Sequence, residues 1–486
     1  MDHKEKSNFL NYIDGEWVSS SSGQLFINTN PADESDVIGH FQLSDESDAT
    51  KAVKAASKAF LTWRKVPISK RVSILNSAAQ YLEDHAAEFA VELTREEGKP
   101  VGQAKDEILR SAQTIRFYAV EGLSYTGETF PQDDPQMSVY TVREPLGVVT
   151  VIAPWNFPIS IPARKIAPAL IAGNTVVFKP SSEAPLIGLR LVEAFVAAGI
   201  PSGVLNFITG NSSVVGPVIT RSKEIRAISF TGSTRVGEEI HRNASLTTRT
   251  QMELGGKNPL IVMEDADLDL AVDLTIKGGL SLSGQACTGT SRVLVMKQVQ
   301  EEFTNKLVSK VKALKIGNGL NSGAEIGPLA SAKQLSSVLK FIEIGKKEAT
   351  LLTGGERLTG AEFDKGYFVS PAIFTNVTQT MEIAKKEIFG PVISIISVDS
   401  FEDAMNKAND TEYGLSAAIA TKSGVYSHRF IDEIQSGTAK VNRTTTGNLI
   451  NAPFGGVKSS STATFRESGR GGLEFYTQIK TVYRGY

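Results

Sequence analysis

The chain has 486 residues, which is too long for one ordinary hydrophobic core and predicts two or three domains. Its formal net charge of -2 and its lack of long basic or acidic runs exclude a bulk electrostatic attraction to nucleic acid or to an anionic membrane. No apolar run is long enough to span a membrane, the first residues lack the apolar core of a signal peptide, and the single cysteine, Cys287, cannot form an internal disulfide. We therefore expect a cytoplasmic protein.

The first third of the chain is expected to be mainly helical, because its apolar residues recur at helical spacing. Helices are predicted at residues 48–63, 71–93 and 103–118. Residues 128–143 contain prolines and β-branched side chains, which favour an extended arm.

From Gly147 onward, short apolar runs alternate with helical patterns. Strands are predicted at residues 148–153, 174–178, 204–209 and 226–230, separated by helices at 158–171, 186–198, 215–222 and 235–242. Repeated β-α units of this size predict a parallel sheet with right-handed crossovers, which places ligands at the carboxyl ends of its strands.

A second alternating region runs from residue 259 to the neighbourhood of residue 442. Its predicted strands are 260–262, 291–296, 391–397 and 415–420, and its predicted helices are 268–282, 300–314, 332–347 and 401–408. The tail, residues 475–483, alternates like a strand and is expected to pair with the arm.

Cys287 lies among small and polar residues in SGQACTGTSR, residues 283–292. These neighbours leave room for a substrate, so Cys287 is a candidate nucleophile, and a buried structural cysteine is the alternative. None of the five histidines stands in a motif, and no group of histidines and carboxylates has the spacing of metal ligands. We therefore expect neither a Cys–His pair nor a metal site.

Two further side chains are candidates for catalysis. Glu253, in QMELGGKNP, lies where an apolar strand meets a glycine turn. Partial burial there would raise its pKa and suit it to act as a general base, whereas an N-cap or a salt bridge to Lys257 is the alternative. Asn156, in APWNFP, follows the first strand of the parallel region and could donate to a developing oxyanion, whereas capping of the next helix is the alternative.

Two segments could meet a phosphate or a ribose. FTGSTRVG, residues 230–237, combines a strand, a glycine turn and a helix start, which points backbone N–H groups at an anion. Lys179, in FKP, ends another strand. A plain helix-capping turn and a solvated surface lysine are the respective alternatives, and neither GxGxxG nor a P-loop motif is present.

Seven motifs occur in one order along the chain. They are PWNFP from Pro154, KPSS from Lys179, GSTRVG from Gly232, ELGGK from Glu253, GQAC from Gly284, EIFGP from Glu387 and PFGGVK from Pro453. With this set the chain resembles the aldehyde dehydrogenase superfamily over nearly its whole length. The resemblance implies an α/β fold with three parts: a Rossmann-type parallel-sheet cofactor domain (1–123 and 146–254), an α/β catalytic domain (255–460) and a small β oligomerisation arm (124–145 and 461–486).

The same resemblance implies roles for individual residues. Cys287 would attack the aldehyde carbon, Asn156 and the Cys287 N–H would hold the oxyanion, and hydride transfer to a nicotinamide cofactor would leave a thioester. Glu253 would activate the water that releases the acid. The residues assigned to the cofactor are Trp155, Lys179, Ser182, Gly232, Ser233, Gly237, Leu254, Glu387 and Phe389.

Ser182 sets the expected cofactor. Family members that strongly prefer NAD resemble one another in having a glutamate three residues after the Lys179 equivalent, where it accepts from the ribose 2′-hydroxyl. A carboxylate would repel a 2′-phosphate, whereas Ser182 tolerates one, so we expect NADP to be accepted and preferred. Glu183, one place later, keeps NAD as the alternative cofactor.

Arg164, in IPARK, bears on the substrate. Dehydrogenases similar to the succinic semialdehyde enzyme carry an arginine there that pairs with the distal carboxylate, and tend to have a second one where this chain has Ser281. FLNYIDGEW (9–17) and NPAD (30–33) are also similar to 2-oxoglutarate semialdehyde dehydrogenases, and Asn442 is assigned to the substrate as well. We expect oxidation of a semialdehyde carboxylic acid; a helix-surface role for Arg164 and an uncharged aldehyde substrate are the alternatives.

Two other functions fit the residues less well. Transfer of the thioester to coenzyme A would not need Glu253, and a non-catalytic binding or structural relative would have lost Cys287, Glu253 or Asn156. The expected partners are a small-molecule aldehyde and further copies of the chain, as a homodimer or homotetramer, because the arm and the strand-like tail suggest a sheet shared between subunits.

Overall fold

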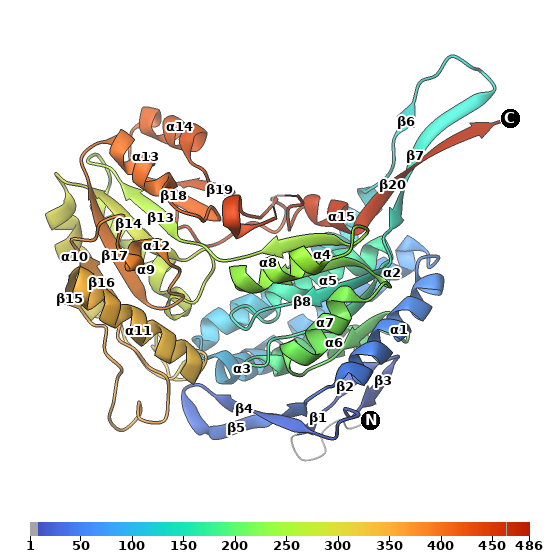
Figure 1. Cartoon of the computed structure of the whole chain (residues 1–486), viewed down its shortest axis with the longest axis horizontal. Coiled ribbons are helices and arrows are strands. Elements are labelled where there is room, and N and C mark those ends of the chain that lie inside the picture. The colour runs from blue at the N-terminus through green and yellow to red at the C-terminus, as the bar shows by residue number, and fades with distance from the viewer. Residues whose placement is uncertain (1–7, 463) are drawn as a thin grey trace.

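A computed structural model describes residues 8–462 and 464–486 of the chain. Two seven-stranded sheets flanked by helices form two lobes, and a narrow arm projects from one of them (Figure 1). This architecture confirms the predicted α/β class, while the exact domain boundaries stay a prediction. In the described part of the chain, no helix combines the length and apolarity needed to cross a membrane.

Five strands precede the first helix, in a region where the sequence predicted mainly helix. They are β1 (Asn8–Phe9), β2 (Asn11–Ile13), β3 (Glu16–Val18), β4 (Leu25–Asn30) and β5 (Asp33–Gln42). Asp14 and Gly15 both have positive φ, 53° and 89°, and make the two-residue turn between β2 and β3. An Asp-Gly pair between short apolar runs is a hairpin signal, and the sequence-based prediction overlooked it.

Four long helices follow the strands. They are α1 (Glu46–Trp63), α2 (Ile68–Asp84), α3 (Ala86–Glu97) and α4 (Val101–Ser124). The single helix predicted at 71–93 is two helices, because the backbone departs from helical geometry at His85 (φ −102°, ψ 9°). Gly98, with φ of 97°, ends α3, and the following Pro100 precedes α4. α4 packs between α2 and α5.

The first large sheet has the order β12-β11-β8-β9-β10-β2-β3. Its central strands are β8 (Val148–Ile152), β9 (Thr175–Lys179), β10 (Leu205–Phe207), β11 (Ile225–Thr231) and β12 (Arg249–Glu253), and all of these neighbours are parallel. The helices between them are α5 (Ser160–Ala172), α6 (Pro185–Ala197), α7 (Ser212–Arg221) and α8 (Thr234–Asn243). From β8 the chain adds β9 and β10 on one side of β8, and it then adds β11 and β12 on the other side. The direction in which strands are added therefore reverses beside β8. Ligands bind at such a switch point, at the carboxyl ends of the strands.

The second large sheet has the order β15-β16-β17-β14-β13-β18-β19, with only β15 antiparallel to its neighbour among the described strands. The strands are β13 (Asn258–Val262), β14 (Thr290–Met296), β15 (Thr350–Thr353), β16 (Ala372–Thr375), β17 (Val392–Val398), β18 (Ser416–Ala420) and β19 (Thr438–Val441). The helices are α9 (Leu268–Leu280), α10 (Gln300–Lys312), α11 (Ala332–Glu348), α12 (Glu382–Lys385), α13 (Phe401–Asn409) and α14 (Gly424–Glu433). A 3₁₀ turn, η1 (Ser281–Gly284), continues α9.

The arm is a three-stranded sheet of β6 (Thr129–Phe130), β7 (Met137–Pro145) and β20 (Thr477–Gly485), in the order β20-β7-β6. The predicted pairing of tail and arm is confirmed, with Thr477 opposite Pro145 and Gly485 opposite Met137. Residues 475 and 476, predicted as strand, instead end the helix α15 (Gly471–Tyr476). A second 3₁₀ turn, η2 (Lys458–Ser460), lies before it.

Burial explains why α5 can hold catalytic groups in place. Val149, Val151 and Phe178 of the first sheet are fully buried, and α5 packs between β8 and α4. Nearly every residue of α5 is buried for that reason. Close packing of this kind leaves the backbone little room to move, so the segment between β8 and α5 is a rigid part of the fold.

Candidate active site

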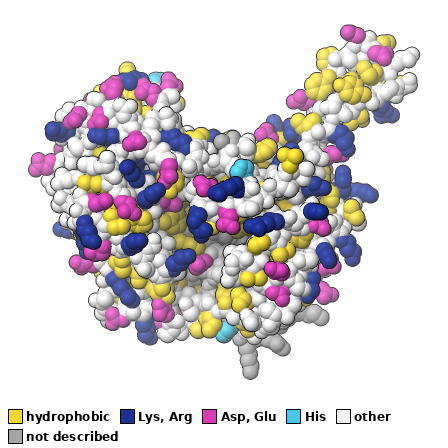
Figure 2. All heavy atoms as spheres, viewed as in Figure 1, with side chains coloured by type: hydrophobic (Ala, Val, Ile, Leu, Met, Phe, Trp, Pro, Cys, Tyr) yellow, Lys and Arg dark blue, Asp and Glu magenta, His cyan; other side chains and the backbone are white. Residues whose placement is uncertain are grey.

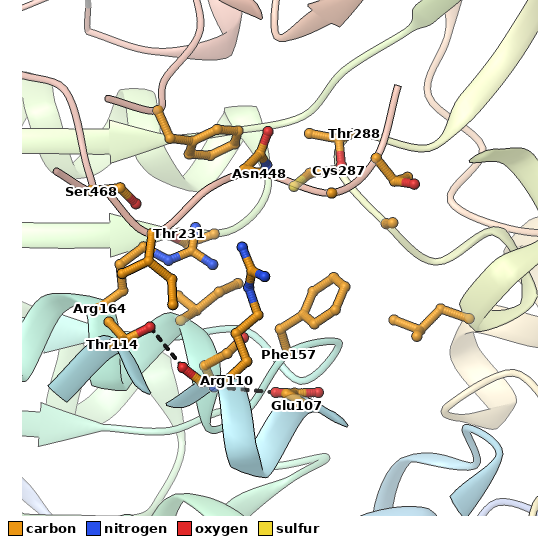
Figure 3. Close-up of a pocket in the computed structure, with 18 of the residues that line it drawn as sticks. Glu107, Arg110, Thr114, Phe157, Arg164, Thr231, Cys287, Thr288, Asn448 and Ser468 are labelled. Atoms are coloured by element: carbon orange, nitrogen blue, oxygen red, sulfur yellow. Dashed lines mark hydrogen bonds between the residues drawn. The ribbon is translucent and has the colours of Figure 1, made fainter. Parts of the chain in front are cut away.

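A cavity of about 480 Å³ lies where the two lobes meet, and Cys287, Glu253 and Arg164 all line it. Its walls come from α4, the start of α5, the end of β12, the turn after α9 and the loop 446–450. Cys287 and Thr288 lie on one side of the cavity, opposite the side chains from α4 and α5 (Figure 3). The volume suits a small molecule.

The turn that carries Cys287 has an unusual backbone. Leu282, Ser283 and Gly284 have φ of 55°, 55° and 72°, all in the left-handed region. A Cβ at Gly284 would approach the Gly390 carbonyl oxygen to 2.1 Å, so only glycine fits there. The Cys287 carbonyl accepts a hydrogen bond from Asn258 Nδ2 (2.8 Å). These contacts fix the nucleophile candidate on a rigid loop.

The Cys287 thiol is held in its neutral form. Burial raises the pKa of the thiol to about 12, and the nearby carboxylates of Glu387 and Glu253 act in the same direction. A thiol of that pKa is not a thiolate at neutral pH, so a reaction at its sulfur needs a base that removes the proton.

Glu253 ends β12 and lines the same cavity as Cys287. It is buried, and neither of its carboxylate oxygens has a hydrogen-bond partner among the described residues. Burial raises the pKa of Glu253 well above its usual value, the Glu467 carboxylate raises it further, and Lys165 opposes the shift. The alternative salt bridge to Lys257 is not formed, because the Lys257 Nζ is also without a partner in the described part of the chain.

Two charged residues beside Glu253 were missed by sequence reasoning. Glu467 is buried and accepts from Lys165 Nζ (2.6 Å) and Arg164 (3.3 Å), and these two cations lower its pKa. Lys165 is fully buried and also donates to Ser229 Oγ (2.9 Å). Lys165 and Glu467 lie 302 residues apart in sequence, so no local pattern could have paired them.

Asn156 follows β8 and its amide reaches the loop of Cys287. Its Nδ2 donates to the Gln285 carbonyl (2.8 Å), two residues before Cys287. Its own carbonyl accepts from Lys99 Nζ (2.8 Å). Asn156 does not cap α5, because the N–H groups of Ile159 and Ser160 donate to Glu107 Oε1 (3.3 and 3.2 Å). The amide therefore lies beside the sulfur-bearing turn.

Lys179 ends β9 as a buried amine. Burial lowers its pKa to about 8, and its only acceptor in the described part of the chain is the Pro180 carbonyl (3.1 Å). The solvated lysine considered as an alternative is therefore not observed. Such a poorly paired amine at a switch point fits a bound group that brings hydroxyl or phosphate oxygens.

Ser182 lies in the turn between β9 and α6. Asn28 Nδ2 donates to the carbonyls of Ser182 (3.5 Å) and Glu183 (3.1 Å), which holds the turn in place. The Glu183 carboxylate is hydrogen-bonded by the Ser181 hydroxyl. Glu183 would contact the ribose if NAD were the cofactor. Its carboxylate is thus already bound by a neighbouring side chain.

The N-terminus of α8 is open to an anion. Ser233 is its N-cap, but the Ser233 hydroxyl makes no capping hydrogen bond, so the first N–H groups remain for a ligand. A Cβ at Gly237 would approach Leu254 Cδ2 to 2.3 Å, and one at Gly232 would approach the Phe230 ring to 2.6 Å. Glycine is needed at both positions because α8 packs closely on these side chains.

Glu387 and Phe389 face this region from the second lobe. The Phe389 ring meets the Trp155 ring edge to face at 5.4 Å. Glu387 accepts from the Gly256 N–H (3.0 Å), and burial raises its pKa to about 7. The residues assigned to the cofactor thus come from both lobes and fit a dinucleotide lying between them.

Asn442 is the one predicted substrate residue that does not line the cavity. It follows β19, and its side chain is bound to the Thr421 backbone through Oδ1 (3.0 Å) and Nδ2 (2.9 Å). Among the described residues, no group of three or more histidine, cysteine or carboxylate side chains is arranged to hold a metal ion.

A family model described as the aldehyde dehydrogenase family matches residues 17–482. Among similar sequences, the alpha-ketoglutaric semialdehyde dehydrogenase of Bacillus subtilis is 45% identical and covers 99% of this chain and 98% of its own length. The alpha-ketoglutarate semialdehyde dehydrogenase of Haloferax volcanii is 42% identical, with coverage of 98% and 99%. The 2,5-dioxopentanoate dehydrogenase of Saccharolobus solfataricus is 41% identical, with coverage of 97% and 98%.

Solved structures agree with the sequence matches. A 3,6-anhydro-L-galactose dehydrogenase in complex with NAP has a TM-score of 0.94 at 36% identity, covering 98% of this chain and 99% of its own. The betaine aldehyde dehydrogenase of Staphylococcus aureus in complex with NAD+ has a TM-score of 0.95 at 33% identity, covering 99% and 96%. Sequence and fold together show that the chain belongs to the aldehyde dehydrogenase family and is an aldehyde-oxidising oxidoreductase.

Proposed function

We propose that the protein oxidises the aldehyde group of a semialdehyde carboxylic acid, with 2-oxoglutarate semialdehyde as the leading candidate, to the carboxylic acid. The observation that carries this proposal is one cavity lined by a thiol (Cys287), an unpaired carboxylate (Glu253) and a guanidinium group (Arg164). The thiol and the carboxylate suit the chemistry at the aldehyde, and the guanidinium suits a carboxylate at the far end of the substrate. The three similar sequences, from Bacillus subtilis, Haloferax volcanii and Saccharolobus solfataricus, are dehydrogenases of this semialdehyde, which is also called 2,5-dioxopentanoate, and they support the same substrate.

The first chemical step falls to Cys287, Glu253 and Asn156. Glu253 takes the proton of the Cys287 thiol, whose raised pKa makes a base necessary. The sulfur then bonds to the aldehyde carbon, and the carbonyl electron pair moves onto the oxygen. The Asn156 amide and the Cys287 N–H donate to that oxyanion. A nicotinamide cofactor, when bound, accepts the hydride that leaves this carbon.

Release of the acid falls to Glu253. Glu253 first releases the proton of the thiol to solvent, and its carboxylate then takes a proton from water. The hydroxide oxygen bonds to the thioester carbon, the bond from that carbon to the Cys287 sulfur breaks, and the departing sulfur takes the proton from Glu253. Glu467 and Lys165 set the electrostatic environment of this step, because one raises and the other lowers the pKa of Glu253. An amide at position 253 could not perform either proton transfer.

Residues of both lobes would hold the cofactor. Lys179 and Ser182 would meet the adenosine ribose, the N-terminus of α8 at Ser233 would meet a phosphate, and Glu387 would meet the nicotinamide ribose beside Phe389. NADP is the preferred cofactor, because Ser182 brings no negative charge against a 2′-phosphate and the Glu183 carboxylate is engaged by Ser181.

Absorbance of the reduced cofactor tests both parts of the proposal. Purified protein is mixed with NADP or NAD and with 2-oxoglutarate semialdehyde, succinic semialdehyde or the uncharged pentanal. We expect the highest kcat/KM for a semialdehyde acid with NADP, and Ser182→Glu should shift the preference toward NAD. Equal kcat/KM for pentanal and both acids would refute the substrate class, and an unshifted Ser182→Glu would refute the cofactor assignment.

A further inference from the structure

Arg110 is an exposed cation on the cavity wall whose guanidinium has no partner in the described part of the chain. It lies on α4 together with Gln103, Glu107 and Thr114, and the spacing of these four residues places them on one helix face along the cavity wall. The Arg110 guanidinium makes no hydrogen bond and no ion pair among the described residues. Unpaired guanidinium groups in cavities are suited to bind anions, since they present a planar fork of donors.

The other charges of the cavity are compensated. Lys99 pairs with Glu107 (2.5 Å), and Arg164 shares Glu467 with Lys165. Arg164, Lys165, Glu467 and Glu253 form a group of two cations and two carboxylates, and among the described residues none of these carboxylates bonds Arg110. Asp106 also lines the cavity; it is exposed, as Arg110 is, and the two make no ion pair among the described residues.

Arg110 and Arg164 are close enough to repel each other. Both guanidinium groups reach into the cavity from the same side, one from α4 and one from α5 (Figure 3). Burial lowers the pKa of Arg110, and the positive charge of Arg164 lowers it further. Two like charges held together in a cavity are stabilised by an anion that lies between them.

We propose that Arg110 and Arg164 together bind the distal carboxylate of the substrate, and that Arg110 is a specificity residue for aldehydes bearing that group. A carboxylate has two oxygens and accepts from two guanidinium groups at once. Similar dehydrogenases tend to have a second arginine at the position of Ser281, which carries no charge. Arg110 thereby supplies the second cationic contact in this chain. The inference rests on the proposed oxidation of a semialdehyde acid at Cys287.

Kinetics of Arg110→Gln, Arg164→Gln and the double variant test the pair. For a semialdehyde acid, each single change should raise KM about ten- to a hundredfold, since each removes a charge-assisted contact. For pentanal, KM should change by no more than about twofold, because a neutral aldehyde does not use the contact. Lys105→Gln removes one positive charge from an exposed position on the same helix and should leave both KM values unchanged.

Binding of glutarate, a dicarboxylate that does not react, gives a readout independent of turnover. Calorimetry should show glutarate binding to the wild type and to Lys105→Gln, and binding weakened about tenfold or more in Arg110→Gln. Arg110→Lys should retain part of the affinity for glutarate, because lysine keeps the positive charge but lacks the planar set of N–H donors of the guanidinium group. Thermal unfolding of each variant confirms that it is folded.

The outcomes separate the two proposals. If the wild type oxidises acids and pentanal equally well, the proposed substrate class fails, and glutarate binding alone then decides the role of Arg110. If the wild type prefers acids and Arg110→Gln keeps both that preference and the glutarate affinity, the inference about Arg110 is overturned while the proposed function stands.

Discussion

At the scale of single residues, the chemistry depends on Cys287 and Glu253. Both react in their deprotonated forms, but their raised pKa values favour the protonated forms. Burial raises the pKa of Cys287 to about 12 and also raises the pKa of Glu253. The neutral forms are favoured because charge is costly inside the cavity. Catalysis therefore requires proton transfers rather than a preformed thiolate.

The raised pKa of Glu253 predicts a pH dependence. A carboxylate with a raised pKa stays protonated to higher pH than an ordinary glutamate, and the protonated form cannot act as a base. We expect kcat to rise with pH through the pKa of Glu253, and to fall by a factor of about 10² to 10³ in Glu253→Gln. A kcat that is flat from acidic to neutral pH in the wild type would contradict the role of Glu253.

At the scale of elements, a buried ion pair joins three segments that the sequence separates. Lys99, just before α4, donates to Glu107 (2.5 Å) on α4 and to the Asn156 carbonyl (2.8 Å) after β8. Glu107 also accepts from the first N–H groups of α5. The pair thus fixes the start of α5 against α4 and sets the position of the Asn156 amide.

Removal of the Lys99 amine tests this arrangement. Lys99→Met leaves the Glu107 carboxylate buried without its cation and should lower the free energy of unfolding by about 3 kcal/mol, measured by urea denaturation. It should also lower kcat, because Asn156 loses a contact that positions it. If Asn156→Ala and Lys99→Met lower kcat additively, Lys99 does not act through Asn156. Lys105→Met, on an exposed part of α4, is the matched control.

The elements that could be predicted are those with a strong local period. The β-α units from β8 to α8 follow from alternating apolar runs, and the carboxyl ends of their strands bear Lys179 and Glu253 as expected. The break at His85 was missed because a helical period can continue across a break. Strands β1 to β3 were missed because two or three residues carry little pattern, and β5 because its ten residues do not alternate between buried and exposed. Arg110 gave no signal, since its position opposite Arg164 depends on how α4 and α5 pack.

At the scale of the whole molecule, the arm exposes an apolar surface. Four of its large hydrophobic side chains are exposed: Phe130, Ile479, Tyr483 and Tyr486. Figure 2 shows hydrophobic side chains on the surface of the arm. β20 is also an edge strand, with unpaired backbone groups on one side. Both features predict that the arm packs against another copy of the chain, in a homodimer or homotetramer.

Charge on the arm should break that assembly. Ile479→Asp combined with Tyr483→Asp should give a smaller particle by light scattering, because both side chains are more than half exposed and their burial must occur between subunits. Val425→Asp places the same charge on α14, where the side chain is 67% exposed, and should leave the mass unchanged. A wild-type protein that is monomeric would contradict the prediction.

The most direct test of the account is the mass of the covalent intermediate on Cys287. Wild-type protein is mixed with NADP and a semialdehyde acid, quenched in acid within the first turnover and weighed by intact-protein mass spectrometry. Because acid stops hydrolysis of the thioester, we expect an adduct of the aldehyde mass less two hydrogens, mapped to Cys287 by peptide digestion. The adduct should be absent without cofactor and absent in Cys287→Ser. An unmodified Cys287 under turnover conditions would contradict the account.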